Sequence, residues 1–224
     1  MSIDLDKLFQ LVERLRKEAI GEPKLIREKH AYEYGEKSTK IVALLKLVRS
    51  AHGVSALVAL LNQGLVIDFG AILRCINDCH TEIYFLLEDY PKTSTNVDKF
   101  VRGFFENTID GYLSTETPAV ESKKIRAAMV RVLKGQHDEE TRQRIDRIYT
   151  TFCGYVHANY AHIMEAYNGA TLSFNLAGIP DRSQKEMRLE HIELAASGVA
   201  SAAAFIAKTL DMDDLYREIM RELK

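Results

Sequence analysis

The chain has 224 residues, of which 46% are hydrophobic and 28% charged, a globular composition that excludes a disordered or fibrous class. Thirty basic and 32 acidic residues leave a formal net charge of −2, so no overall positive field draws the protein to nucleic acid or to an anionic membrane. Three cysteines, an odd number, and an N-terminus that does not begin like a secretory signal predict a cytoplasmic location. The most apolar stretch, Leu194–Ile206, is shorter than the roughly 20 residues that span a bilayer, so no membrane partner is expected.

Hydrophobic periodicity predicts helices along almost the whole chain. They cover about residues 4–20, 23–63, 65–90, 96–113, 117–134, 138–168 and 183–210, with a short amphipathic helix from residue 213. Glycine or proline at their ends marks most boundaries, and Thr117 with Pro118 marks a helix start. Residues 170–180 alternate as strands do, so they predict one short hairpin at most.

The fold class that follows is all-α, a single-domain multi-helix bundle of seven or eight helices over residues 1–224. We expect an N-terminal helix in 1–22, the bundle in 23–210 and a short C-terminal helix in 211–224. The helices 65–90 and 138–168 are the expected central pair. The alanine-rich stretch Leu194–Ala207 is expected to pack closely against a neighbour, and an exposed face of such small residues would suit a symmetric homodimer.

The helix at 65–90 carries the densest group of reactive side chains. Its apolar face contains Ile72, Ile76 and Ile83, while Arg74, Asp78 and Glu82 follow one another at i,i+4 spacing on the opposite side. Two interpretations remain open. The charged face is either a solvated ladder of ion pairs or a partly buried cluster around a ligand.

The same helix places Cys75 and Cys79 one turn apart, next to His80. A structural zinc site needs four convergent ligands, and this helix offers no recognisable second pair, so we expect no metal and no cofactor. The cysteines are better explained as small buried hydrophobes, and His80 as a hydrogen-bonded histidine at the edge of the core.

In the helix expected at 138–168, an apolar stripe includes three tyrosines, whose buried hydroxyl groups need hydrogen-bond partners. Cys153 and His157 border the stripe, and His157 is the histidine that we predict to be functional, with Tyr160 beside it. A nucleophile pair of Cys153 and His157 is disfavoured, because both lie on one helix and the sole nearby acid is Asp146. Familiar enzyme motifs are absent from the sequence.

Three stretches, LRCINDCHTEIYFLLED, CGYVHANY and SFNLAGIP, resemble a bacterial family of all-helical domains of unknown function. In that family a helix with an arginine and an acid faces a helix with a histidine. The resemblance covers most of the chain after residue 40 and implies a site formed by Arg74, Asp78 or Glu82, and His157. It implies no activity.

The spacing of Arg74 and His80 also resembles that of the HEPN group of helical ribonucleases. This resemblance implies metal-independent RNA cleavage by these two residues. Cys75 stands where that group has a polar residue, and the two side chains point about 120° apart on a straight helix. Their convergence would therefore require a dimer or a bend.

The leading hypothesis is non-catalytic binding of a small molecule or a protein partner through an inter-helical polar pocket. The expected lining residues are Arg74, Asp78, Glu82, His157 and Tyr160. The alternatives are a HEPN-type ribonuclease with a toxin or defence role, which uses Arg74 and His80, and a helical scaffold without a ligand. The near-neutral charge weakens the nuclease hypothesis without excluding it.

Overall fold

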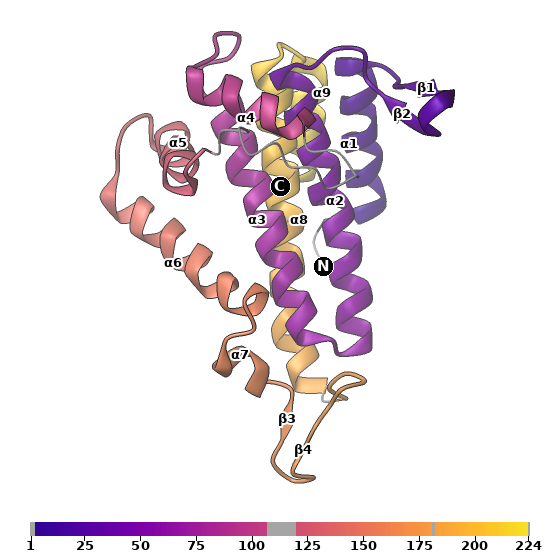
Figure 1. Ribbon diagram of the computed structural model, residues 1–224, viewed down its shortest axis with the longest axis vertical. Coiled ribbons are helices and arrows are strands. Elements are labelled where there is room, and N and C mark those ends of the chain that lie inside the picture. The colour runs from indigo at the N-terminus through magenta and orange to yellow at the C-terminus, as the bar shows by residue number, and fades with distance from the viewer. Residues whose placement is uncertain (1–2, 107–119, 181, 224) are drawn as a thin grey trace.

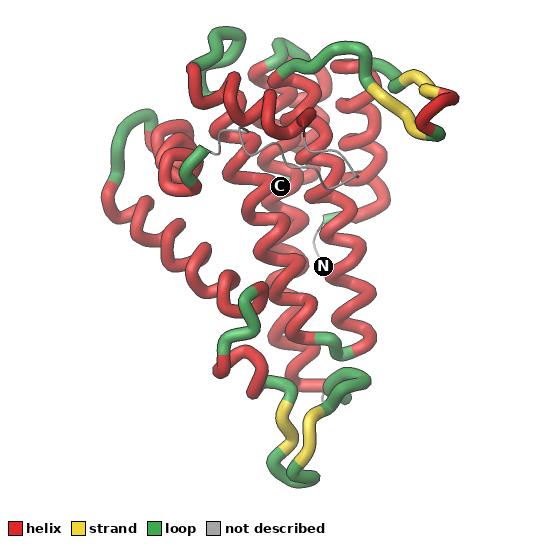
Figure 2. The backbone as a smooth tube through the Cα atoms, viewed as in Figure 1, coloured by secondary structure: helices red, strands yellow, loops and turns green. Residues whose placement is uncertain are grey.

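The predicted all-α bundle is confirmed in a computed structural model of the protein, which describes residues 3–106, 120–180 and 182–223 (Figures 1 and 2). Within these residues there are nine α-helices and two antiparallel pairs of short strands. The helices are α1 (Leu5–Ile20), α2 (Thr39–Gln63), α3 (Val66–Leu87), α4 (Thr95–Glu106), α5 (Ser122–Lys134), α6 (Glu139–Val156), α7 (Tyr160–Met164), α8 (Arg182–Thr209) and α9 (Asp213–Glu222). The strands are β1 (Lys24–Ile26), β2 (Ala31–Glu33), β3 (Tyr167–Asn168) and β4 (Ser173–Phe174).

Three long helices, α2, α3 and α8, lie side by side along the long axis and form the centre of the bundle (Figure 1). Their buried side chains join those of α1 and α9 in one hydrophobic core. The alanine-rich part of α8 is inside this core, where Ala196, Ala200 and Ala203 are fully buried. Its close packing is therefore confirmed, but the face is covered within the chain, so a homodimer would need another surface.

Two helical stretches, Thr39–Gln63 and Glu186–Thr209, are long and apolar enough to cross a membrane by length and composition alone. More than half of the most apolar window of each is buried inside the fold. The central helices of a bundle meet the same criterion, because they are apolar on nearly every side.

The segment expected to be helical from residue 23 is not helical until Thr39. It forms a second hairpin instead, in which β1 pairs with β2 around a short 3₁₀ turn at Arg27–Lys29. His30 ends that turn in the left-handed region at φ 48°, a conformation that a continuous helix excludes. The hairpin adds to the one expected near residues 170–180, which is present as β3 and β4.

The helix expected at 138–168 begins as predicted, with Asp138 accepting a hydrogen bond from the Thr141 amide at 2.7 Å, but it ends at Val156. Ala158 has φ 52°, so the chain leaves the helix there and restarts in the short α7. Gly169 lies in the β3–β4 turn and does not end a helix. The expected central position is also wrong, because Ile145 and Gly154 are the only buried residues of α6, and α3 packs most extensively against α2.

The remaining boundaries agree closely with the sequence. Asp4 caps α1 by accepting from the Lys7 amide at 3.2 Å, and Gly21 ends it at φ 68°. The helix expected at 96–113 is present as α4, and its last predicted residues lie outside the described part of the chain. Thr117 and Pro118, the predicted helix start, also lie outside it, and α5 begins at Ser122.

Candidate functional site

The charged face of α3 is partly covered by α5 and α6: Arg74 is buried, whereas the Asp78 side chain is 39% exposed. Arg74 is 9% exposed, and its guanidinium carbon lies 3.8 Å from the centre of the Tyr149 ring on α6. Its Nε donates to the Cys153 sulfur at 3.4 Å, and its Nη1 is ion-paired with Asp78. Arg74 therefore links α3 to α6 by stacking and by a hydrogen bond.

A second buried arginine approaches the same tyrosine from α5. Arg126 is 8% exposed, and its guanidinium carbon lies 4.0 Å from the centre of the Tyr149 ring. Its Nε donates to Asp146 Oδ1 at 2.6 Å, while the other oxygen of Asp146 accepts from Arg142 at 3.0 Å. The Asp146 carboxylate thus accepts hydrogen bonds from two arginines, Arg126 and Arg142.

These side chains surround a cavity of about 100 Å³ between α3, α5 and α6, here called the arginine cavity. It is lined by Arg74, Asp78, Thr81, Glu82, Ser122, Ile125, Arg126 and Tyr149. Glu82 is not paired with Arg74. It binds Lys46 of α2 at 2.6 Å. The structure therefore brings together three predicted site residues, Arg74, Asp78 and Glu82.

Two buried arginine nitrogens at this cavity have no hydrogen-bond partner among the described residues, and one of them, Arg74 Nη1, is ion-paired with Asp78. Arg126 Nη1 is buried and has no hydrogen-bond partner among the described residues. A buried polar group left in this way costs about 1–3 kcal/mol, so folded proteins rarely tolerate it without a compensating partner. The arginine cavity therefore has a place for an acceptor atom.

The structure does not bring His157 and Tyr160 to the arginine cavity. Because α6 ends at Val156, His157 becomes the residue after the helix, and its side chain is exposed. Tyr160 follows in α7 and is 79% exposed. Tyr160 was expected in the apolar stripe of one continuous helix and His157 at the border of that stripe, but the break at Ala158 interrupts the helix.

Sequence reasoning missed two residues that complete the cavity, Ser122 and Arg126. Arg126 lies four residues before Val130 and next to Ile125, so an arginine sits within the apolar side of an otherwise amphipathic helix. That placement was the available signal, because arginine is rarely buried unless it is paired, as Arg126 is with Asp146.

His80 faces a different part of the molecule from Arg74. Its Nε2 is 2.7 Å from the Ser50 hydroxyl on α2, and its ring lies against Gly198 of α8 so closely that a methyl group there would be 2.6 Å from it. Burial lowers the pKa of His80 to about 4, which keeps the ring neutral at pH 7. Within one chain, Arg74 and His80 do not share a cavity.

The two cysteines of α3 interact with each other. A hydrogen bond from the Cys79 thiol, assisted by the positive charges of Arg49 and Lys46, lowers the pKa of Cys75 to about 6. The same bond, together with burial, raises the pKa of Cys79 above its ordinary value. In the part of the chain that the structure describes, no three His, Cys, Asp or Glu side chains are grouped to hold a metal ion.

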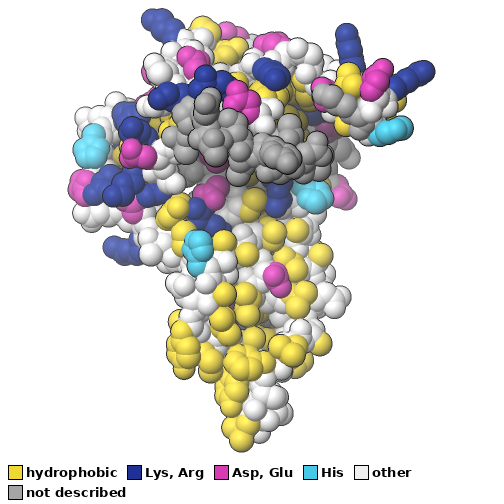
Figure 3. Space-filling model, viewed as in Figure 1, with side chains coloured by type: hydrophobic (Ala, Val, Ile, Leu, Met, Phe, Trp, Pro, Cys, Tyr) yellow, Lys and Arg dark blue, Asp and Glu magenta, His cyan; other side chains and the backbone are white. Residues whose placement is uncertain are grey.

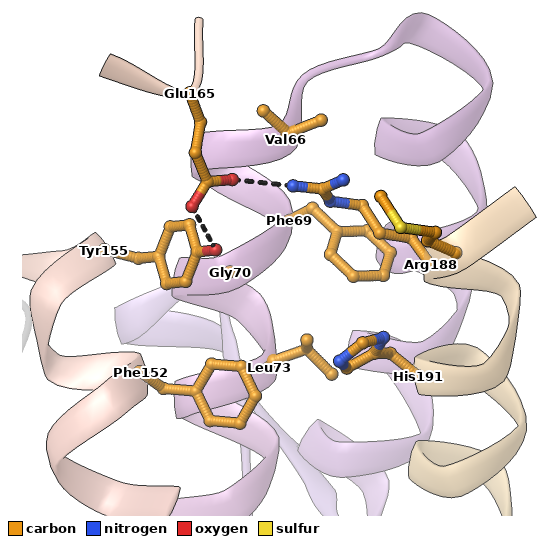
Figure 4. Close-up of a pocket in the computed structure, with 10 residues that line it drawn as sticks. Val66, Phe69, Gly70, Leu73, Phe152, Tyr155, Glu165, Arg188 and His191 are labelled. Carbon is orange, nitrogen blue, oxygen red and sulfur yellow. Dashed lines mark hydrogen bonds and ion pairs between the residues drawn. The ribbon is translucent and has the colours of Figure 1, made fainter. Parts of the chain in front are cut away.

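A larger cavity of about 360 Å³ lies between α3, α6 and α8 (Figure 4). Its apolar wall includes Phe69, Leu73 and Phe152. Glu165 closes one side, accepting from the Tyr155 hydroxyl at 2.7 Å and from Arg188 at 2.6 Å. Burial, and then the bond to Glu165, raises the pKa of Tyr155 to about 12. The charges at this cavity satisfy one another and hold α6, α7 and α8 together.

Comparisons of the chain with protein-family models, with curated proteins and with solved structures gave no match.

Proposed function

We propose that the protein binds a small molecule through a carboxylate or phosphate group that enters the arginine cavity. The observation that carries this proposal is the buried Nη1 of Arg126, which has no acceptor among the described residues. An anionic oxygen is the acceptor that best matches a guanidinium, because charge-assisted hydrogen bonds are roughly twice as strong as neutral ones. Ser122 lies one helical turn before Arg126 and adds a hydroxyl donor at the same cavity.

The size of the cavity limits what can enter it. Its volume of about 100 Å³ is a few times the roughly 30 Å³ that one water occupies in the liquid. A carboxylate or phosphate group fits this space, whereas a whole nucleotide does not. The remainder of the ligand would lie outside, toward the exposed start of α5.

The charges around the cavity favour binding over catalysis. Asp78 is paired with Arg74, and Glu82 with Lys46. Each of these carboxylates therefore already has a cationic partner within the fold. The fixed charges nearly balance, so selectivity comes from directed donors and not from a strong positive field.

Thermal unfolding with simple anions tests the proposal. Inorganic phosphate, acetate and succinate are each titrated against the wild-type protein, with sodium chloride at matched ionic strength as the control for screening. A ligand present at 100 times its Kd stabilises the folded state by about 2.7 kcal/mol, which raises Tm by roughly 5–10 °C in a chain of this length. At least one of the three anions should give a saturable shift of this kind.

Matched arginine variants assign the shift to the cavity. Arg126→Met keeps the length and apolar part of the side chain but removes the donors, and it is expected to weaken anion binding about tenfold or more. Arg131→Met is the control, because Arg131 lies on the same helix but pairs with Glu88 outside the cavity. Equal anion shifts in wild type and Arg126→Met would refute the proposal, as would no shift beyond that of sodium chloride.

A further inference from the structure

One end of the molecule exposes large apolar side chains that no other described residue covers (Figure 3). They belong to the end of α6, to α7, to the β3–β4 hairpin and to the start of α8. We call six of them the apolar pole: Val156, Tyr160, Leu172, Phe174, Leu176 and Met187. Leu172 is 76% exposed and Leu176 is 90% exposed.

Residues 148–180, which supply five of the six pole residues, are almost free of charge. Between residues 148 and 180, Glu165 is the one Asp, Glu, Lys or Arg in the sequence, although 28% of the chain is charged. Glu165 is bound by Tyr155 and Arg188, so it does not offer a free charge to a partner. On the face shown in Figure 3, Lys, Arg, Asp and Glu side chains gather toward the opposite end, whereas apolar side chains dominate this one.

The hairpin that forms the tip is held firmly at its base. The Ile179 amide donates to the Gly64 carbonyl in the α2–α3 turn at 2.9 Å, and a methyl group on Gly178 would lie 1.9 Å from the Gln63 oxygen. The Tyr167 and Phe174 rings pack edge to face at 5.2 Å across the strands. The exposed leucines are therefore presented on a pre-formed surface, which lowers the entropy lost on binding.

Leu172 has no evident role within one chain. Its φ of 51° lies in the left-handed region, which favours glycine, asparagine or aspartate, and its side chain is not buried. Neither backbone geometry nor packing in the monomer accounts for a leucine at this position. Contact with a partner would.

We propose that the apolar pole is the interface of a two-fold symmetric homodimer. With roughly 150–250 Å² for a fully exposed side chain of this size, the six residues expose roughly 600–1,000 Å² in total. The largest apolar patch of a typical monomer is about 300–600 Å². One side of a standard protein interface buries about 800 Å², so the pole has the area that a stable dimer needs.

Charge also favours a second copy over other partners. In a two-fold interface the same patch lies on both subunits, so any unpaired charge near the axis would face its own copy. Within residues 148–180, which supply five of the six pole residues, the one charged side chain, Glu165, is paired with Arg188, so this part of the pole avoids that repulsion. A membrane surface is usually bound with the help of lysines or arginines around the apolar residues. Residues 148–180, which supply five of the six pole residues, contain none, and Arg188 beside Met187 is bound to Glu165.

The test is the oligomeric state of the full chain by sedimentation velocity and light scattering, from about 1 μM to about 100 μM. Wild type should reach twice the chain mass of 25.4 kDa within this range. The double variant Leu172→Asp with Leu176→Asp should raise the dimer Kd about 100-fold or more, because each substitution occurs on both subunits. Aspartate suits the left-handed backbone at position 172, so this variant is expected to fold.

A matched double variant, Leu25→Asp with Leu133→Asp, controls for the added charge, since both leucines are 49% exposed and lie outside the pole. It should dimerise as wild type does. A third variant, Tyr160→Asp, weakens the same interface from α7 and does not depend on the hairpin. The proposal is overturned if wild type stays monomeric over the whole range, if the pole variants dimerise like the control, or if wild type binds phosphatidylcholine vesicles as a monomer.

Discussion

Acidification is expected to destabilise the protein through His80. Burial between α2, α3 and α8 lowers the pKa of this imidazole from 6.5 to about 4. A difference of this size corresponds to roughly 3 kcal/mol between the two protonation states. As the pH falls, the unfolded chain takes up a proton on His80 before the folded chain does. This contribution to stability is therefore fully present above pH 6.5, declines between pH 6.5 and about 4, and stays lost below that.

Urea unfolding at a series of pH values measures this loss. The variant His80→Gln keeps a polar group within reach of Ser50 but cannot titrate, so the free energy of unfolding of wild type should fall by roughly 3 kcal/mol more than that of the variant between pH 7 and pH 4. Comparing the two proteins cancels the titration of the carboxylates. His137→Gln is the control, because the His137 side chain is 68% exposed. Parallel pH profiles of wild type and His80→Gln would refute the argument that burial keeps His80 neutral.

Two further predictions concern α3 and the hairpin. The rate of Cys75 alkylation by iodoacetamide should rise with pH with a midpoint near pH 6, because the Cys79 thiol donates a hydrogen bond to the Cys75 thiolate. Cys79→Ala should move that midpoint upward, and peptide mass spectrometry measures the alkylation rate in both proteins. A wild-type midpoint near the ordinary value of 9.0 would contradict the interaction. Gly178→Ala should lower the free energy of unfolding by about 1–3 kcal/mol or more, because φ is +106° and the added carbon meets the Gln63 oxygen. Gly169→Ala is the control variant, since no neighbouring atom lies within 4 Å of a carbon added there. Equal stability of the two variants in urea would show that the hairpin base is not held as described.

Much of the fold could be predicted from local signals. The ends of α1 follow from Asp4 and Gly21, and the start of α6 from Asp138, because these residues make or relieve backbone interactions that depend on few neighbours. The end of α6 could not be predicted in this way. The apolar spacing continues past Val156 without a proline or glycine, so no local signal marks the left-handed Ala158.

The part of the candidate site that depends on one helix could also be predicted from the sequence, whereas the part formed between helices could not. The pairing of Arg74 with Asp78 depends on one helix and follows from their spacing. The burial of that pair depends on Tyr149 and Arg126, which come from distant parts of the chain. Periodicity describes which residues share a face of one helix, but it does not say which other helix covers that face.

The reactive side chains of α3 therefore do not form one site, although they lie within nine residues of sequence. Cys75, Cys79 and His80 interact with groups on α2 and α8, inside the most extensively packed part of the bundle. Arg74 and Asp78 face α5 and α6, where a cavity of about 100 Å³ remains. The arginine cavity lies on this second side. On the first side, a buried neutral histidine and its close contact with Gly198 contribute to the stability of the fold instead.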